Sequence, residues 1–436
     1  MQERWNHPSV VIWDAQNESE KFEKTGEAIQ RVRRMDLSNR PWDNGWSPRQ
    51  AENDPVETHT YMFAQKRFRM PSIARETGEG FLFDWVPGPR RGAVILNEYG
   101  WEWLNRDGSP TTLSRDYRVY ERIRPDVKVW SPALYREAYA RTLAMETEFF
   151  RGHRKLAGVL HFCGLGYSRP GGQTSDNFID IQNVAFEPEF RRYVGDAFAP
   201  VGLMIDFWND RVARGSTQDA PVHVINDLYE AWRGAVTLSV KEGDRLISRQ
   251  TREVTVAALD MGIIPFTFQV PTTEGRYQLI AELLKEGERS VQSLRDFVAG
   301  DNMDRREKPY PGKATASSSY GTFKAENVAD GDENTRWSSD FSDPQWIMID
   351  LQEPQRLGRI VLDWEDAYGK SYFIEVSDDR KEWKKVYDTT DGKGGLEDIS
   401  LQPVTARFVR LTGRARVTPW GYSLYSFDLF PPVANK

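Results

Sequence analysis

The sequence predicts a multidomain chain that begins with part of a parallel (β/α)8 barrel, continues with an antiparallel β-sandwich and ends in a third domain. Three observations support this division. Short apolar runs alternate with helical patterns over residues 1–185, as in a parallel sheet. Short strands separated by turn signals then fill residues 186–300, as in an antiparallel sandwich. A polar, proline-containing linker at 301–311 separates both parts from the third domain at 312–436.

The composition restricts the classes of function. The chain has 436 residues, a formal net charge of −7 and a pI near 5.5. It contains no long basic run, which argues against nucleic acid as a partner, and no apolar run long enough to span a membrane. Because Cys163 is the single cysteine, a disulfide framework is excluded and a cysteine-ligated metal site is disfavoured.

The aromatic content has two explanations. Fifteen tryptophans and seventeen tyrosines are present, and packing inside the domains explains most of them. Stacking of indole rings on the C–H faces of sugars is the functional alternative. Composition alone favours packing.

Two apolar runs in the first part end in glutamate. Val10–Trp13 leads to Asn17 and Glu18, and Gly92–Gly100 is a second apolar strand that contains Glu98 near its end. A carboxylate at the C-terminal end of a buried parallel strand is where barrel enzymes place their chemistry. Two such glutamates supply the acid/base and the nucleophile that retaining glycoside hydrolysis needs.

The remaining elements of the first part continue the alternation. The charged stretch Glu20–Arg34 has an apolar stripe and predicts a helix. Ser131 as N-cap and Pro132 in the first turn predict a second helix, which runs to about Arg154. Further strands are predicted at Arg34–Leu37, Val56–Phe63 and Leu156–Phe162. About five strands result, whereas a closed barrel needs eight.

The residues around the two glutamates resemble glycoside hydrolase family 2, the β-galactosidase and β-glucuronidase group. The stretch NHPSVVIWDAQNES (Asn6–Ser19) is similar to the acid/base strand of that family, and VILNEYG (Val94–Gly100) is similar to its nucleophile strand. The resemblance covers the first part of the chain. It implies that Glu18 is the acid/base, that Glu98 is the nucleophile and that Asn17 holds the sugar 2-hydroxyl.

The resemblance also sets expectations for geometry and protonation. In a complete barrel the two carboxyl groups should lie about 5 Å apart. Burial and the neighbouring charge should keep Glu18 protonated, whereas Glu98 should be ionised. No metal or other cofactor is needed for this catalysis.

Four further residues are candidates for binding the substrate. Tyr61, on the same predicted strand as His59, looks like the family tyrosine that hydrogen-bonds the nucleophile, with a packed strand tyrosine as the alternative. Trp101 and Trp103 follow the nucleophile and are candidates to wall a sugar subsite. His161 ends the last strand and is a candidate to line the same pocket, with a core role as the alternative.

The position of the acid/base motif raises the question of what precedes it. The family places this motif after the fourth barrel strand, whereas here its strand starts at residue 9. We therefore expect this chain to be the C-terminal part of a larger β-glycosidase that acts on oligo- or polysaccharides in the periplasm or outside the cell. Two alternatives are a non-catalytic carbohydrate-binding or adhesion protein with a vestigial half-barrel, and an enzyme assembled from two chains.

The second and third parts carry resemblances of their own. Residues 186–300 resemble the immunoglobulin-like domain that follows the barrel in family 2 enzymes. Gly312–Phe430 resembles a discoidin-type domain, the β-sandwich or jelly-roll fold of carbohydrate-binding module family 32. Its loop aromatics Trp420 and Tyr368 are the candidates to contact a glycan. The matching stretches are Ala314–Ser319, Ala329–Trp337, Trp346–Leu351 and Phe408–Leu411.

The discoidin-type resemblance also implies a structural calcium ion. Asp330, Asp332 and Thr335 match positions where this fold often binds calcium through oxygen ligands. The acidic ligand that the family has near its C-terminus falls at Ser426 here. The alternative is a turn in which the two aspartates cap backbone amides.

Overall fold

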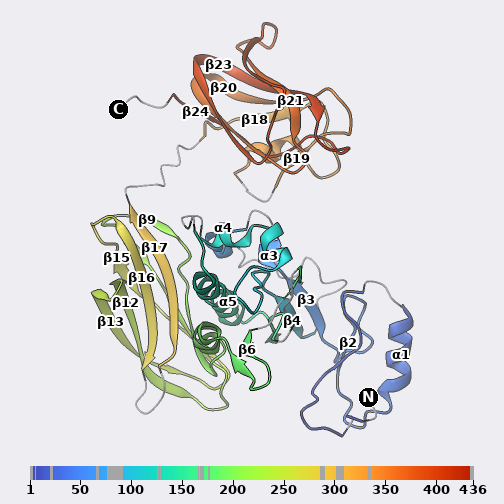
Figure 1. Ribbon diagram of the computed structural model, residues 1–436, viewed down its shortest axis with the longest axis vertical. Helices are drawn as coiled ribbons and strands as arrows, with labels where there is room; N and C mark the ends of the chain where they lie inside the picture. Colours follow the sequence, from blue (N-terminus) through green and yellow to red (C-terminus); the bar gives the residue numbers. More distant parts are fainter. Residues whose placement is uncertain are drawn as a thin grey trace. The chain divides into compact units, whose positions relative to one another are not determined.

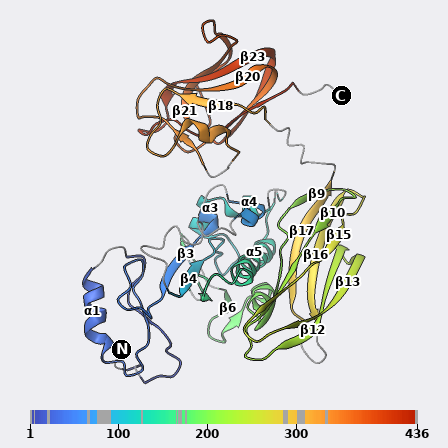
Figure 2. The same ribbon diagram turned by 180° about the vertical axis from the view of Figure 1, so that it is seen from behind.

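The chain forms two compact units, Met1–Met303 and Asp304–Lys436. They are drawn in Figure 1 and, from behind, in Figure 2. Among the described residues, no helix is long and apolar enough to cross a membrane. The computed structural model describes residues 3–4, 6–19, 23–64, 68–75, 92–124, 127, 129–164, 166, 171–174, 177–284, 290–300, 309–331 and 335–432.

The N-terminal part of the first unit contains parallel strand pairs. Strand β1 (Trp13–Asp14) pairs in parallel with β2 (Trp42–Asp43). Strands β3 (Val56–Thr60), β4 (Val94–Tyr99) and β5 (Gly158–Val159) form a separate parallel sheet in that order. Parallel pairing agrees with the β/α alternation of the sequence, while closure of these strands into a barrel stays a prediction.

The strand predicted at Arg34–Leu37 is wrong. Helix α1 (Glu23–Arg33) ends there in turns, and the second strand is β2 instead. The reason is Asp36, whose carboxylate accepts hydrogen bonds from the backbone of Ser38 and Arg40 and from the indole of Trp13. A carboxylate that binds nearby backbone N–H groups stabilises a turn at the expense of a strand.

The predicted long helix is confirmed. Helix α5 (Pro132–Gly152) begins at Ser131, whose hydroxyl accepts a hydrogen bond of 3.2 Å from the backbone N–H of Leu134. The helix packs against β5 and against the sandwich strand β17 (Gln292–Gly300). In both views it lies between β4 and the sandwich (Figures 1 and 2). The shorter elements of this part are α3 (Thr112–Asp116), α4 (Val119–Ile123), α6 (Gly195–Ala197), β6 (Phe178–Asp180), β7 (Ala185–Phe186), two 3₁₀ turns (Met62–Ala64 and Met70–Arg75) and a π-helical turn (Phe190–Val194).

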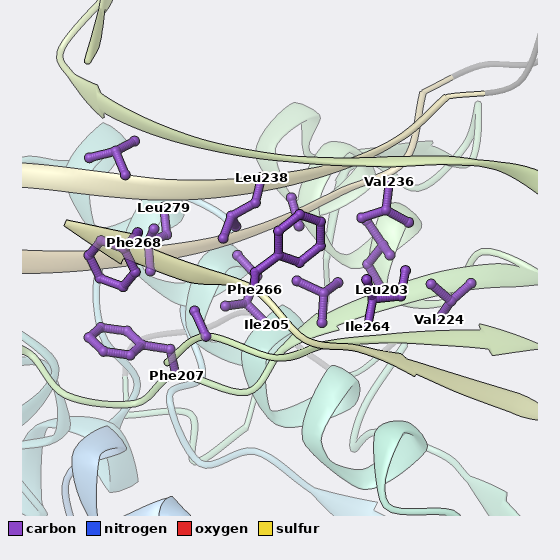
Figure 3. Packing of buried hydrophobic residues seen from close by; sticks show 14 of the residues in the cluster. Leu203, Ile205, Phe207, Val224, Val236, Leu238, Ile264, Phe266, Phe268 and Leu279 are labelled. Atoms are coloured by element: carbon purple, nitrogen blue, oxygen red, sulfur yellow. The ribbon is translucent and has the colours of Figure 1, made fainter. Parts of the chain in front are cut away.

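A β-sandwich forms the rest of the first unit. One sheet has the order β14-β11-β8 and the other the order β13-β12-β16-β17-β9, and all pairs except β17–β9 are antiparallel. Figure 3 shows Leu238 and Leu279 of one sheet directed toward Ile205 and Ile264 of the other. The strands are β8 (Val201–Ile205), β9 (Arg211–Ala213), β10 (Thr217–Asp219), β11 (Val222–Asn226), β12 (Trp232–Glu242), β13 (Arg245–Val256), β14 (Met261–Ile264), β15 (Thr267–Gln269), β16 (Gly275–Leu284) and β17 (Gln292–Gly300).

The second unit is a β-sandwich built on two long bent strands. Strands β20 and β23 pair over most of their length, with register shifts where they bend. The strand-like sequence context of Trp337, Trp346 and Trp364 predicts a core role for each. Trp337 and Trp364 are buried in the core, whereas Trp346 is only half-buried. The elements are β18 (Lys313–Ala316), a 3₁₀ turn (Ala325–Ala329), β19 (Trp337–Ser338), β20 (Gln345–Trp364), β21 (Gly369–Ser377), β22 (Lys384–Thr389), β23 (Leu396–Arg416) and β24 (Ser423–Phe430).

Candidate active site

Three titratable side chains lie at alternate positions along strand β3 and the residue after it. Glu57 and His59 are on the strand and Tyr61 follows it directly, so their spacing of two places them on one side of the sheet. On the neighbouring strand β4 the register shifts, because Thr58 pairs with Leu96 and His59 pairs with Glu98. The extra residue, Asn97, donates a hydrogen bond of 2.6 Å to Glu57. The bulge therefore lets both Asn97 and Glu98 reach the β3 row.

Glu18 approaches this row from the segment after β1. Its backbone has a φ of 45°, a left-handed conformation that glutamate seldom adopts. Its carboxylate lies 2.9 Å from Nδ1 of His59, and 44% of its side chain is exposed. This exposure does not agree with the expectation that burial keeps Glu18 protonated. Asn17 is exposed beside it.

His59 is enclosed by carboxylates. Its side chain is 1% exposed, its Nδ1 lies 3.5 Å from Glu98 Oε2, and its Nε2 lies 3.5 Å from Glu57 Oε1. Burial alone would lower the pKa of His59, but the close contact with Glu57, the hydrogen bond to Glu18 and the charge of Glu98 outweigh it and raise the pKa to about 9. At neutral pH the ring is therefore an imidazolium.

Tyr61 and Glu98 form a hydrogen-bonded pair. The Tyr61 hydroxyl donates to Glu98 Oε2, as the sequence predicts. Burial raises the pKa of Glu98, and the hydrogen bond from Tyr61 and the charge of His59 oppose that rise. Burial and the contact with Glu98 also raise the pKa of Tyr61, so this hydroxyl stays a donor.

The cluster also has the ligand types of a metal site. Glu18, His59 and Glu98 each offer one ligand atom, and the three atoms lie within 4.8 Å of one another. A cation at Nδ1 of His59 would have to displace the proton that the surrounding carboxylates favour.

Further acidic groups lie behind the cluster. Burial and the charges of Glu57 and Asp14 raise the pKa of Asp43 to about 8. Burial and Glu57 likewise raise the pKa of Asp14. With a pKa near 8, Asp43 is largely protonated at neutral pH and adds little negative charge. The carboxylates that lie against His59 are Glu18, Glu57 and Glu98.

Aromatic rings line one side of the site. Trp101 lies edge-on to Tyr61 with ring centroids 5.0 Å apart, and it is half-buried. Trp103 is 3% exposed and donates its indole N–H to the carbonyl of Phe162 at 2.5 Å, so it supports Trp101 from behind and does not itself face solvent. Trp46, which the sequence prediction missed, lies edge-on to His59 at 5.3 Å.

His161 packs among aromatic rings and does not contact the cluster around His59 in the described contacts. Its ring lies 5.6 Å from that of Phe190 and 6.3 Å from that of Tyr99, and Asn177 contacts its Nε2 at 3.3 Å. Burial lowers its pKa to about 4. These contacts favour the core role over the predicted pocket role.

The C-terminal unit carries an exposed aromatic cluster, which we define as Tyr320, Phe341 and Trp420. The exposed fractions are 49%, 40% and 63%, and successive ring centroids lie 4.7 and 5.5 Å apart. Arg416 donates to the carbonyl of Trp420 at 3.2 Å and holds this loop. Only Trp420 was predicted from the sequence, and the other predicted aromatic, Tyr368, packs against the core.

The predicted calcium residues are described only in part. Asp332 lies outside the described residues. The Thr335 hydroxyl donates a hydrogen bond of 2.7 Å to Asp330. The calcium ion stays a prediction.

Comparison with known proteins identifies the C-terminal domain. Residues 313–427 match the family model described as F5/8 type C domain, which confirms the predicted discoidin-type domain. Because the match lies within this domain, the glycosidase and immunoglobulin-like assignments of the first two parts stay predictions.

Individual relatives also match only a short segment of this chain. The polysaccharide lyase 8 family protein HylA of Enterococcus faecalis is 38% identical over 102 residues, which are 23% of this chain and 7% of that protein. Chitosan-binding module 1 of a chitosanase/glucanase from Paenibacillus sp. IK-5 is 44% identical over 28% of this chain and 96% of the module, with a TM-score of 0.27. Module 2 of that enzyme, solved with chitotriose, is 37% identical over 28% of this chain and 98% of the module, also with a TM-score of 0.27.

Proposed function

We propose that this chain belongs to a carbohydrate-active enzyme in which Glu98 and Glu18 hydrolyse β-glycosides with retention, and in which the F5/8 type C domain binds carbohydrate. The observation that carries the catalytic part is the distance between the two glutamates. Their facing oxygens lie within 4.8 Å of each other although they come from separate strand ends. Retaining glycosidases have carboxyl groups about 5–5.5 Å apart, whereas inverting enzymes leave room for a water molecule between them.

Each residue has a defined role in this reaction. Glu98 attacks the anomeric carbon while Glu18 protonates the leaving oxygen, and Glu18 then removes a proton from the water that hydrolyses the glycosyl-enzyme. Tyr61 orients Glu98 by donating to its Oε2. Trp101 offers a ring for the sugar, and Asn17, beside Glu18, is the candidate to hold the 2-hydroxyl.

Azide rescue tests the two glutamate roles separately. The wild-type chain, Glu98→Ala and Glu18→Ala are incubated with azide and 2,4-dinitrophenyl β-glycosides of galactose, glucose, glucuronic acid and mannose. Glu98→Ala should yield the α-glycosyl azide, because azide then attacks the substrate directly with one inversion. Glu18→Ala should yield the β-glycosyl azide, because azide then opens the glycosyl-enzyme.

The exposed Glu121 supplies the control, and Glu121→Ala should behave as the wild type. The assignment is contradicted if the two variants give the same anomer. It is also contradicted if the wild-type chain hydrolyses none of the four glycosides.

A second candidate function is carbohydrate binding without catalysis. The aromatic cluster of Tyr320, Phe341 and Trp420 favours it, because exposed neighbouring rings offer stacking surfaces for sugars. Trp420→Ala should weaken binding to a retained polysaccharide about 10-fold or more, since an exposed anchor ring of this kind contributes more than 1 kcal/mol. Leu396→Ala, at another exposed position of the same domain, is the control. Equal binding by both variants in affinity electrophoresis on chitosan, galactan and xylan would contradict the assignment of this surface.

A further inference from the structure

His59 occupies an unusual place for a histidine in a two-glutamate site. It lies between the acid/base and the nucleophile, with Nδ1 2.9 Å from Glu18 Oε1 and 3.5 Å from Glu98 Oε2. Its other nitrogen faces Glu57, whose side chain is fully buried. One imidazole therefore contacts three carboxylates from both sides.

We propose that His59 is a positioning residue that stores, in the resting site, the proton that Glu18 delivers to the leaving group. This inference rests on the proposed function and extends it to a residue outside the two-glutamate pair. The observation behind it is that Glu18, with 44% of its side chain exposed, lacks the deep burial that commonly keeps a general acid protonated near neutral pH. A buried cation in hydrogen-bond contact supplies the proton instead.

The proton that leaves His59 in the first step of the reaction returns to it in the second step. In the first step Nδ1 of His59 gives its proton to Glu18 Oε1 as Glu18 protonates the glycosidic oxygen, and His59 becomes neutral. Glu98 meanwhile forms its bond to the anomeric carbon as the bond to the leaving group breaks. In the second step Glu18 takes a proton from the attacking water, and that proton returns to Nδ1 of His59 as Glu98 is released.

Glu57 makes the return of the proton favourable. It faces Nε2 of His59 and is held in place by Asn97, which donates to its other oxygen at 2.6 Å. Among the described residues, the other titratable groups that act on His59 or lie against it are Glu18, Glu98, Tyr61 and Asp14. All of them except neutral Tyr61 are carboxyl groups, so the surroundings favour the imidazolium over the neutral ring.

Substrates that differ in leaving group test the role in catalysis. His59→Asn keeps an N–H donor near Glu18 but cannot be protonated. For phenyl β-glycosides, whose leaving oxygen needs a proton, kcat/KM should fall about 100-fold, the usual contribution of general acid catalysis. For 2,4-dinitrophenyl β-glycosides, whose leaving group needs none, kcat/KM should change less than about 3-fold. An equal loss on both substrates, or no loss on either, overturns the proposal.

Nuclear magnetic resonance tests the stored proton independently of activity. The chain has five histidines, and the imidazole signal missing in His59→Asn identifies that of His59. This signal should report a protonated ring at pH 7 with a pKa near 9, and the pKa should fall in Glu18→Gln. A neutral ring at pH 7, or no response to Glu18→Gln, overturns the proposal. If the wild-type chain hydrolyses no glycoside but this titration holds, the proposed function fails while the stored proton on His59 stands.

Discussion

Tyr61, directly after strand β3, is hydrogen-bonded to Glu98, the proposed nucleophile. Its hydroxyl donates to Glu98 Oε2 and opposes the rise in pKa that burial imposes on Glu98. A neutral donor that binds the charged form of a carboxylate favours ionisation. The protonation of Glu98 at mildly acidic pH therefore depends on this hydroxyl together with the charge of His59.

Replacing Tyr61 by phenylalanine should move the pH dependence of activity. Without the donor the pKa of Glu98 rises further, so the acid limb of the kcat/KM profile should shift to higher pH. At the optimum kcat should fall about 10-fold, because a hydrogen bond to a charged group contributes about 1.5–3 kcal/mol. Tyr135→Phe, which removes a hydroxyl from α5, should leave the profile unchanged. A Tyr61→Phe profile that matches the wild type in its acid limb would remove Tyr61 from the account.

Glu102 and Glu146 should make the protein less stable at alkaline pH. Both carboxyl groups are fully buried, and burial raises the pKa of Glu102 to about 8 and that of Glu146 well above its ordinary value. Their contribution to stability is complete below about pH 4.5 and is lost as the pH rises through the folded-state pKa near 8. Glu146→Gln should therefore raise the unfolding free energy at pH 9 by about 1–3 kcal/mol.

Thermal unfolding between pH 5 and pH 9 measures this effect. The matched control is Glu137→Gln on the same helix, where the side chain is 42% exposed and the change should stay within about 0.5 kcal/mol. If the unfolding free energy of Glu146→Gln falls with pH as steeply as that of the wild type, then Glu102 and Glu146 do not explain the pH dependence of stability.

Individual site residues could be predicted from sequence only where a motif surrounds them. Glu18, Glu98 and Tyr61 lie in motifs, and the structure brings them together. Glu57 was missed, although its spacing of two from His59 places both on one face of the strand. The exposure of Glu18 depends on how the segment after β1 turns, and residue spacing does not contain that information.

At the scale of elements, helix α5 connects the site region to the sandwich. Glu148 on α5 forms an ion pair of 2.8 Å with Arg295 of β17, and both side chains are almost fully buried. Ser293 donates to the same carboxylate at 2.7 Å, and the guanidinium of Arg295 lies over the ring of Trp208. A buried pair of this kind fixes how the helix and the sheet pack.

Breaking this pair on one side should destabilise the first unit strongly. Arg295→Met leaves Glu148 buried without its cation, which costs about 3–5 kcal/mol. The double variant Arg295→Met with Glu148→Gln should recover most of that loss, because no uncompensated charge remains. Urea unfolding of the two variants measures both values. Additive losses in the double variant would show that the pair does not act as a unit.

Elements were predictable where the local signal was strong. The Ser131–Pro132 start identified α5, because a capping hydroxyl and an early proline occur together there. Strand β13 was missed because it is exposed along most of its length, so apolar and polar residues do not alternate in it. The two-residue strand β2 was missed because pairing with β1, and not its own sequence, defines it.

At the scale of the whole molecule, the chain divides into two units with separate hydrophobic cores. The sequence predicts a domain boundary at the polar linker 301–311 through the composition of that linker and the discoidin-type motifs after it, which are local signals, and a further boundary near residue 185. It could not show whether the parallel strands close into a barrel, because closure depends on pairing between distant strands. The aromatic cluster was predicted only at Trp420, because its rings come from three separate segments.

Separate cores predict separate unfolding transitions. Calorimetry of the whole chain should show two transitions, and Arg295→Met should lower only the one that belongs to the first unit. The transition of the C-terminal unit should keep its midpoint within about 1 °C, because Arg295 and Glu148 belong to the first unit and the C-terminal unit has its own core. A single transition that shifts as a whole would contradict the independence of the two units.

Covalent trapping tests the central claim most directly. The chain is incubated with 2,4-dinitrophenyl 2-deoxy-2-fluoro-β-glycosides of the four sugars named above, digested and analysed by mass spectrometry. The account predicts one fluoroglycosyl group on the peptide that contains Glu98, its absence in Glu98→Gln, and turnover with retained configuration on the unmodified sugar. A label on any other carboxylate, or no label with any of the four sugars, would contradict Glu98 as the nucleophile of a retaining glycosidase.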